Sequence, residues 1–325
     1  MQIATVYKDV KHDIQRIEKR LATVIDANHP ILHKASIQLL RAGGKRIRPI
    51  FAILSAEFGD KEEHAAEIEA VATALELIHM ASLVHDDVVD DADLRRGKPT
   101  IKQLYDDKTA IYTGDYILAC ALEEVTKVKS IKVHQVLAKS LVHVVEGEMY
   151  QIEDKYQVKQ NLRQYLRRIK RKTALLIASS CKLGALTAGT SKEDANRLFQ
   201  YGYNVGMSFQ IIDDILDFTS TKETLGKPVG NDLLQGHLTL PVLYAMENED
   251  FKLEIERLFS NPSQIKEEAI EDLVHVLHST NAIQRAYDLS DLYLQKALNS
   301  LVKLDNIKAK QTLIKIATLL GKRNY

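Results

Sequence analysis

Apolar residues recur at helical spacing along almost the whole chain. A repeat every three to four residues places side chains on one face of a helix, so each stripe predicts a helix with a buried face. Two of these stripes consist of Ile14, Ile17, Leu21 and Val24, and of Leu137, Leu141, Val144 and Val145. No segment shows a convincing alternation of period two, which a half-buried strand would require.

The stripes predict long helices separated by short breaks. A helix is expected to begin at the capping sequence Ser191-Lys192-Glu193-Asp194. Glycine and proline mark the predicted loops at 92–100 and 219–237. The predicted helices cover 3–26, 62–91, 109–127, 133–153 and 191–218, and the pattern is helical again from 241 to the end.

The composition supports an all-α fold. The chain of 325 residues has 14 Gly and 6 Pro, too few for the frequent turns of a sandwich or barrel. A hydrophobic share of 45% and a charged share of 27% exclude an intrinsically disordered chain. We therefore predict one bundle-like domain of roughly a dozen helices over residues 1–325.

Charge and cysteine content narrow the function classes. Lys+Arg and Asp+Glu both number 44, so bulk positive charge does not favour nucleic-acid binding. Cys120 and Cys181 lack metal-ligand spacing and fit a reducing compartment. The first residues lack the apolar stretch of a signal peptide, and no apolar run approaches the length that spans a bilayer. We expect a cytoplasmic protein without a transmembrane segment.

One aspartate pattern occurs twice, each time at the end of a predicted helix. Carboxylates this close repel one another, and their burial is costly unless cations compensate them. Donors that are all carboxylate oxygens select a hard ion, Mg²⁺ or Mn²⁺, whose remaining positions are usually filled by phosphates and water. One such group alone would more often be a solvated helix end, but two copies favour a metal site and a phosphorylated substrate. The groups are Asp86-Asp87-Val88-Val89-Asp90 and Asp213-Asp214-Ile215-Leu216-Asp217.

Basic and polar residues near these groups are candidates for phosphate binding. Lys45 and Arg48 follow a glycine turn, and Arg95-Arg96 follow the first aspartate group. His79 shares a helical face with Asp86 and Asp90. The weaker candidates, each of which alone also fits an ordinary structural role, are Lys172, Thr173, Gln210 and Lys227.

The sequence resembles the trans-polyprenyl diphosphate synthases, the family of farnesyl and geranylgeranyl diphosphate synthases, over almost its whole length. The resemblance rests on Gly43 to Pro49, His85 to Gly97, Gly114-Asp115, Lys172-Thr173 and Phe209 to Asp217. It implies an all-α fold with a central apolar cavity and the two aspartate groups facing each other across its mouth. It also implies Mg²⁺ binding led by Asp86, Asp90 and Asp213, with Asp87, Asp214 and Asp217 in support.

The resemblance further implies the two substrates and their contacts. Isopentenyl diphosphate would bind Lys45, Arg48, His79 and Arg96, and an allylic diphosphate would bind Arg95, Lys172, Thr173, Gln210 and Lys227. In the family, the fourth and fifth residues before the first aspartate limit product length when they are large. Here these residues are Ser82 and Ala81, so we expect a product longer than farnesyl diphosphate. The chain departs from the family at Asn231 and His237, where many members have lysine.

Within the family, the chain most resembles the large subunits of bacterial hexaprenyl and heptaprenyl diphosphate synthases. This likeness implies a small, dissimilar, non-catalytic subunit, with a homodimer as the alternative, and a product used for menaquinone side chains. Geranylgeranyl and longer octaprenyl or nonaprenyl products remain open. A terpene cyclase is disfavoured because the second group keeps Asp213, Asp214 and Asp217, and a non-catalytic regulatory subunit is disfavoured because neither group is eroded.

Overall fold

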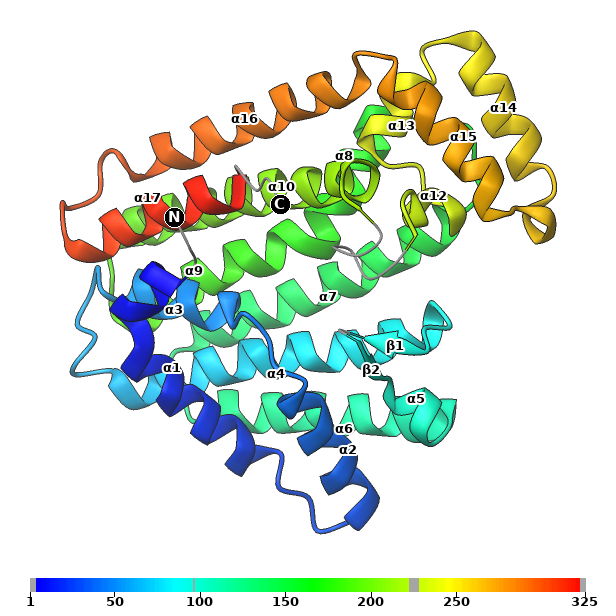
Figure 1. Cartoon of the computed structure of the whole chain (residues 1–325). Coiled ribbons are helices and arrows are strands. Elements are labelled where there is room, and N and C mark those ends of the chain that lie inside the picture. The colour runs from blue at the N-terminus through cyan, green and yellow to red at the C-terminus, as the bar shows by residue number, and fades with distance from the viewer. Residues whose placement is uncertain (1–3, 96, 222–227, 322–325) are drawn as a thin grey trace. The chain divides into compact units, whose positions relative to one another are not determined.

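The computed structural model describes residues 4–95, 97–221 and 228–321. Nearly all of the elements in this part of the chain are helices (Figure 1), so the predicted all-α fold is confirmed. The chain divides into two compact units. Unit 1 contains Met1–Leu137, Ser179–Phe199 and Leu304–Leu313, and unit 2 contains Ala138–Ala178, Gln200–Lys303 and Ile314–Tyr325.

Helix α4 forms the centre of unit 1. It contacts α1, α3 and α6, and the most extensive of these contacts is with α6. Helix α5 follows a short hairpin of two-residue antiparallel strands, in which Arg95 pairs with Lys98. The elements up to this point in the chain are α1 (Ala4–Val24), α2 (Pro30–Arg41), α3 (Ile47–Ala56), α4 (Ala65–Val89), β1 (Leu94–Arg95), β2 (Lys98–Pro99), α5 (Ile101–Leu104) and α6 (Asp107–Val125).

Helix α4 is also the one described helix that is long and apolar enough to cross a membrane. Of the 18-residue window of α4 that meets this criterion, 72% is buried inside the fold. The largest apolar side chains of its middle, Leu75 and Leu77, have no exposed surface. These features are typical of a core helix.

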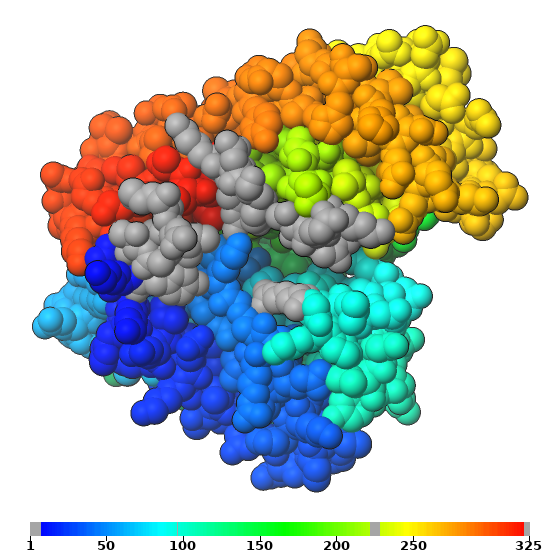
Figure 2. Space-filling model, viewed as in Figure 1, coloured from blue at the N-terminus to red at the C-terminus, as the bar shows by residue number. Residues whose placement is uncertain are grey.

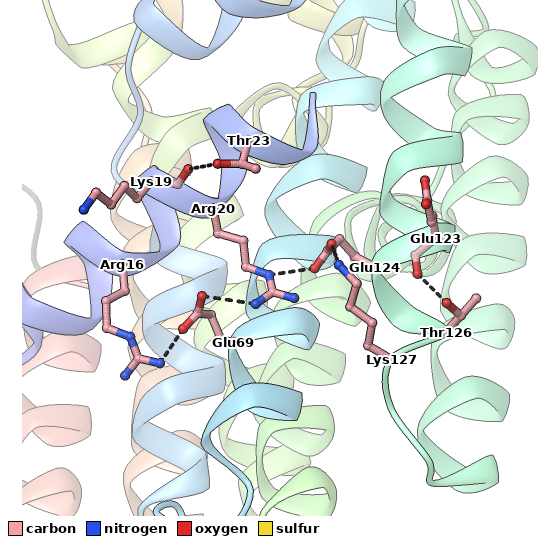
Figure 3. A network of polar contacts seen from close by, with 9 residues as sticks. All are labelled: Arg16, Lys19, Arg20, Thr23, Glu69, Glu123, Glu124, Thr126 and Lys127. Carbon is pink, nitrogen blue, oxygen red and sulfur yellow. Dashed lines mark hydrogen bonds and ion pairs between the residues drawn. The ribbon is translucent and has the colours of Figure 1, made fainter. Parts of the chain in front are cut away.

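An ion-pair network ties α1 to α4 and α6 within unit 1 (Figure 3). Arg20 donates to Glu124 on α6 at 2.8 Å and to Glu69 on α4 at 3.2 Å. Arg16 also pairs with Glu69, and Lys127 pairs with Glu124. Burial alone would lower the pKa of Arg20, but the hydrogen bonds and charges of the two glutamates raise it overall. The network therefore holds the first helix by charge as well as by its apolar face.

Unit 2 has its own apolar core. One cluster surrounds Tyr165, Ile211 and Leu240, and another surrounds Phe218 and Phe251. Helices α14, α15 and α16, yellow to orange, form much of the surface of this unit seen in Figure 2. The remaining elements are α7 (Ile131–Asp154), α8 (Leu162–Ile169), the π-helical turn η1 (Lys170–Ala174), α9 (Leu175–Thr187), α10 (Lys192–Thr219), α12 (Asn231–Leu234), α13 (Leu240–Ala245), α14 (Glu249–Phe259), the 3₁₀ turn η2 (Pro262–Gln264), α15 (Glu267–His278), α16 (Ala282–Leu301) and α17 (Lys308–Gly321).

The boundaries of the helices predicted before residue 219 lie within a few residues of those in the structure. The backbone N–H of Asp194 donates to Ser191 Oγ at 3.1 Å, so the predicted cap of α10 is confirmed. The hairpin of β1 and β2 was not predicted, because strands of two residues carry no periodicity. The predicted second stripe was partly wrong: Leu137 is buried, but Val145 is 64% exposed.

Candidate active site

The first aspartate group lies at the C-terminal end of α4 in unit 1, and its members have different surroundings. Asp87 is buried, and Arg95 contacts its Oδ1 at 2.7 Å through both Nε and Nη2. Burial raises the pKa of Asp87, while the charge and hydrogen bond of Arg95 act against the rise. Asp86 and Asp90 are half-buried.

The hairpin after α4 positions Arg95. Thr100 Oγ1 donates to the carbonyl of Ala92 at 2.8 Å and closes the loop. Gly97 has φ 73, a left-handed conformation that favours glycine and allows the tight turn. Arg96 lies outside the described residues. The loop therefore returns Arg95 to the aspartate group from which it extends.

A small cavity of about 30 Å³ adjoins the first aspartate group. Its lining includes His79, Asp87, Arg95, Lys98 and Arg46. Among the predicted site residues, His79, Asp87 and Arg95 therefore come together here. Lys45 and Arg48 do not line this cavity, although both were predicted to bind the same substrate as His79.

The basic loop before α3 is held by Glu76, a buried residue of α4. Arg46, with φ 45 in the left-handed region, donates from Nη1 to Glu76 Oε1 at 2.9 Å. Burial lowers the pKa of Arg48 to about 10, and the charge of Glu76 acts in the opposite direction. Lys45 is exposed. The sequence offered no sign of Glu76, because it lies within the apolar body of the helix.

Gly114 allows α6 to approach α4 beside the first aspartate group. A Cβ atom at this position would lie 2.3 Å from His85 Nε2. The same ring nitrogen lies 3.3 Å from Asp115 Oδ1. Gly114 and Asp115 therefore both contact the ring of His85, the residue directly before Asp86.

The second aspartate group lies near the C-terminal end of α10 in unit 2. Asp213 is exposed, whereas Asp214 and Asp217 are buried. Asp217 Oδ2 accepts a hydrogen bond from the backbone N–H of Asp232 at 3.0 Å. This group therefore resembles the first one, since it combines an accessible carboxylate with buried ones that have partners within the protein.

Asp214 is the centre of a chain of hydrogen bonds. Tyr165 donates to its Oδ2 at 2.7 Å, and Gln210 Nε2 donates to its Oδ1 at 2.9 Å. Thr173 Oγ1 donates to Gln210 Oε1 at 2.7 Å. Burial raises the pKa of Asp214 to about 8, as do the charges of Asp232 and Asp213, whereas the bonds from Gln210 and Tyr165 lower it. Burial also raises the pKa of Tyr165.

A π-helical turn presents Thr173 and Lys172. Such turns are rare and often lie at functional sites. A Cβ atom on Gly206 of α10 would lie 2.6 Å from the Cα of Ala174, so this glycine lets the turn approach α10 closely. Lys172 Nζ lies 3.0 Å from Glu148 Oε2 on α7. Lys227 lies outside the described residues.

Three contributors to the site were absent from the sequence-based prediction. They are Tyr165, Glu76 and Glu148. Each contacts a predicted residue or its neighbour through tertiary packing. A capping box at Asn161 starts α8 and so gave a local signal for the helix of Tyr165, but not for its partner.

The carboxylates fit a divalent cation that is shared with a substrate. The described residues contain no group of three or more His, Cys, Asp or Glu side chains placed to hold a metal ion alone. Mg²⁺ seldom uses such a cage, because a few carboxylates, phosphates and water usually complete its coordination. Asp86 and Asp90 are half-buried and Asp213 is exposed, and their carboxylate oxygens are the appropriate donor type.

Comparison with known proteins identifies the family. Residues 29–277 match the sequence profile described as Polyprenyl synthetase. The chain belongs to the polyprenyl synthetase family. It is therefore a prenyltransferase, and the family depends on a divalent cation.

Relatives within the polyprenyl synthetase family match the chain over its full length. Heptaprenyl diphosphate synthase component 2 of Bacillus subtilis (strain 168) is 50% identical over 325 residues, which cover 100% of this chain and 92% of that protein. The crystal structure of heptaprenyl diphosphate synthase from Staphylococcus aureus has a TM-score of 0.93 and 46% identity, covering 97% and 99% of the two chains. A polyprenyl synthase from Caulobacter crescentus CB15, solved with calcium and isoprenyl diphosphate, has a TM-score of 0.93 and 29% identity, covering 99% and 98%.

Proposed function

We propose that this chain is the catalytic component of a heptaprenyl diphosphate synthase. It would add isopentenyl diphosphate repeatedly to an allylic primer, with farnesyl diphosphate as the preferred one. The observation that carries the proposal is that each aspartate group combines half-buried or exposed aspartates with buried ones whose carboxylates are hydrogen-bonded within the protein. The full-length similarity to relatives of that name supports the product class.

We assign the accessible carboxylates of Asp86, Asp90 and Asp213 to Mg²⁺, with Asp87, Asp214 and Asp217 in support. When bound, Mg²⁺ would neutralise the leaving diphosphate and so favour its departure. The buried aspartates would hold the surrounding side chains in place. Arg95, fixed by Asp87, would then present its guanidinium edge to phosphate oxygens, for which its geometry is suited.

The remaining predicted residues divide between two substrates. For isopentenyl diphosphate we propose Lys45, Arg48, His79 and Arg96. For the allylic diphosphate we propose Arg95, Lys172 and Lys227, while the neutral dipoles of Thr173 and Gln210 would stabilise the allylic cation. An apolar surrounding would exclude the water that quenches such a cation.

We propose that residues of α4 control the length of the product. Ala81 is 2% exposed, and Ser82 is half-buried, with its hydroxyl donating to the carbonyl of His79 at 2.9 Å. Both side chains are small, so we propose that a growing chain passes them. Heptaprenyl is the favoured product and hexaprenyl the alternative, for use in menaquinone side chains.

A small non-catalytic subunit is the proposed partner, and α7 offers a surface for it. The relative from B. subtilis is named as component 2, which implies another component in that enzyme. In the part of α7 that belongs to unit 2, four apolar side chains follow one another at helical spacing and lie in solvent. They are Val142 (58% exposed), Val145 (64%), Met149 (52%) and Ile152 (49%). A second copy of this chain on the same stripe is the alternative, and a cytoplasmic location remains our prediction.

The experiment that tests the function measures the incorporation of labelled isopentenyl diphosphate with farnesyl diphosphate and Mg²⁺. Asp86→Ala and Asp213→Ala should each reduce turnover more than about a hundredfold, because each removes a proposed metal ligand. Their unfolding midpoints should not fall, because each change relieves repulsion between carboxylates. Asp291→Ala on α16 is the matched control at an exposed aspartate and should retain full turnover. Near-normal turnover of either test variant at saturating Mg²⁺ would refute the assignment.

A further inference from the structure

We propose that a basic face along helix α8 is a docking surface for an anionic phospholipid bilayer. This basic face consists of Lys159, Arg163, Arg167 and Lys170. The inference goes beyond the proposed function, which supplies one of its arguments, and it concerns binding and not turnover. It assigns a role to charged side chains that neither proposed diphosphate site uses.

The segment 155–172 concentrates positive charge in a chain whose net charge is +0. It contains eight Lys and Arg residues and no Asp or Glu. The eight are Lys155, Lys159, Arg163, Arg167, Arg168, Lys170, Arg171 and Lys172. A run of this kind attracts anions if its charges reach solvent without partners.

Three of the eight cations have carboxylate partners within unit 2. Each partner lies on α7. The pairs are Arg168 with Asp154 at 3.2 Å, Arg171 with Glu146 at 3.4 Å, and Lys172 with Glu148 at 3.0 Å. These three carboxylates are therefore already paired, and they leave the basic face without compensation from the same part of α7.

The four side chains of the basic face are exposed, and none has a hydrogen bond or ion pair with any residue that the structure describes. Arg163, Arg167 and Lys170 are spaced by four and three residues, which places them on one side of the helix. The opposite side carries Tyr165 and Ile169, which are buried in an apolar cluster of unit 2. The apolar side of α8 thus anchors the helix while its charges face solvent.

The chemistry of the basic face favours a lipid surface among anionic partners. Clusters of about four to eight Lys and Arg on a helix bind anionic headgroups, which are mobile and require no shaped pocket. Leu162 begins α8, and its 38% exposure adds apolar area beside the charges. A nucleic acid is disfavoured, because Tyr165, the one aromatic residue of α8, is buried and cannot stack on a base.

The place of the basic face in the chain agrees with the proposed function. The π-helical turn that begins at Lys170 carries Lys172 and Thr173, which are proposed to bind the allylic diphosphate. The proposed product has a long apolar tail and therefore partitions into a bilayer. Because the apolar side of α8 is buried in the protein, the attachment would be electrostatic and reversible by salt.

Sedimentation of the full chain with vesicles tests the proposal. Vesicles with equal amounts of phosphatidylglycerol and phosphatidylcholine should bind the chain, pure phosphatidylcholine should not, and raised salt should release the bound chain. The triple variant Lys159→Gln, Arg163→Gln, Arg167→Gln should weaken binding about a hundredfold, at about fivefold per charge. Lys170 stays unchanged because its turn carries Lys172.

Two matched variants control for bulk charge and for side-chain geometry. The triple variant Arg257→Gln, Lys266→Gln, Lys303→Gln removes the same charge from exposed positions elsewhere in unit 2 and should weaken binding less than about threefold. Arg163→Lys combined with Arg167→Lys keeps the charge and should bind as the wild type does. All variants should keep the wild-type urea midpoint, because they change exposed side chains.

Several results would overturn the proposal. They are equal binding of the wild type to both kinds of vesicle, binding to neither, and equal losses in the two triple variants. A wild type that binds no vesicle, with a first triple variant that no longer associates with the small subunit, would assign the basic face to a protein and overturn the proposal. Turnover is measured in the same preparations. Normal turnover without vesicle binding would refute only this inference, whereas vesicle binding without turnover would refute only the proposed function.

Discussion

Asp86 and Asp87 are adjacent in the chain, yet they have different roles in our account. Successive residues of a helix point about 100° apart, so one of the two can face the protein while the other faces solvent. Asp87 lies against Arg95 and is buried, whereas Asp86 is half-buried, as is Asp90 one turn later. The same contrast separates Asp213 from Asp214. A short acidic motif thus supplies accessible carboxylates and the buried carboxylates that hold their surroundings.

Gly114→Ala should destabilise the protein by about 1–3 kcal/mol, because the added Cβ would overpack the contact with His85. The measurement is the free energy of urea unfolding. The control is the same change in a His85→Ala background, where the obstructing ring is gone. There the substitution should become stabilising by up to about 1 kcal/mol, since alanine favours a helix more than glycine does. The same destabilisation in both backgrounds would show that His85 is not the obstacle.

Ala81→Phe should shorten the main product towards geranylgeranyl diphosphate and spare the first condensation. A phenyl ring at this position would fill space that the growing chain is proposed to pass. Mass spectrometry of the products from farnesyl diphosphate measures the effect, with Ala81→Ser as the small-residue control. An unchanged main product from Ala81→Phe would mean that the chain grows along another route.

At the scale of elements, the attachment of α1 depends on two arginines one turn apart. Arg20→Ala should cost about 1–3 kcal/mol, because it removes a donor from Glu124, whose side chain is 2% exposed. Arg16 is 45% exposed and serves as the matched control. Arg16→Ala should cost less than about 1 kcal/mol, and raised salt should reduce that cost further. Equal unfolding free energies for the two variants would contradict this ranking.

The apolar stripe of α7 leads to a prediction about assembly. Val145→Glu should leave the unfolding free energy within about 0.5 kcal/mol, because the side chain is 64% exposed. It should nevertheless abolish association with the small subunit in sedimentation experiments. Leu292→Glu on α16, where the side chain is 50% exposed, is the control and should not affect association. Retained association of Val145→Glu would place the partner on a different surface.

The elements that the sequence predicted are those with a long periodic pattern or a local cap. The boundaries of α4 and α10 lie within a few residues of the prediction, because each has several turns of signal. The β1–β2 hairpin and the π-helical turn were missed, since two or five residues carry no period. Val145 was assigned to a stripe expected to be buried, because the hydrophobic pattern alone does not distinguish a buried face from an exposed apolar one.

In the site, too, features with a local sequence pattern were predicted, and contacts formed by tertiary packing were not. The aspartate groups and the basic loop are contiguous in sequence, and their chemistry was predicted from residue type and spacing. The side chains that hydrogen-bond to these residues or their neighbours lie far away in the sequence. Tyr165 and Asp214 are separated by 49 positions, Arg46 and Glu76 by 30, and Lys172 and Glu148 by 24. Such pairs form only when helices pack, so no local pattern indicates them.

At the scale of the whole molecule, the candidate residues are distributed along most of the chain. Lys45 lies near the start, and Gln210 and Asp217 lie beyond residue 200. The similarity to heptaprenyl diphosphate synthase component 2 of B. subtilis covers 100% of the chain, so it includes all of these segments. The single domain over residues 1–325 stays a prediction, and so does the proposal that both aspartate groups serve one reaction.

The most direct test of this account is the length of the product. The chain is combined with its proposed small subunit, Mg²⁺, farnesyl diphosphate and labelled isopentenyl diphosphate, and the dephosphorylated products are sized by mass spectrometry. The account predicts heptaprenyl as the main product, with synthesis by the chain alone strongly reduced. A main product of geranylgeranyl, octaprenyl or nonaprenyl length would contradict the assigned product, and full long-chain synthesis by the chain alone would contradict the need for a partner.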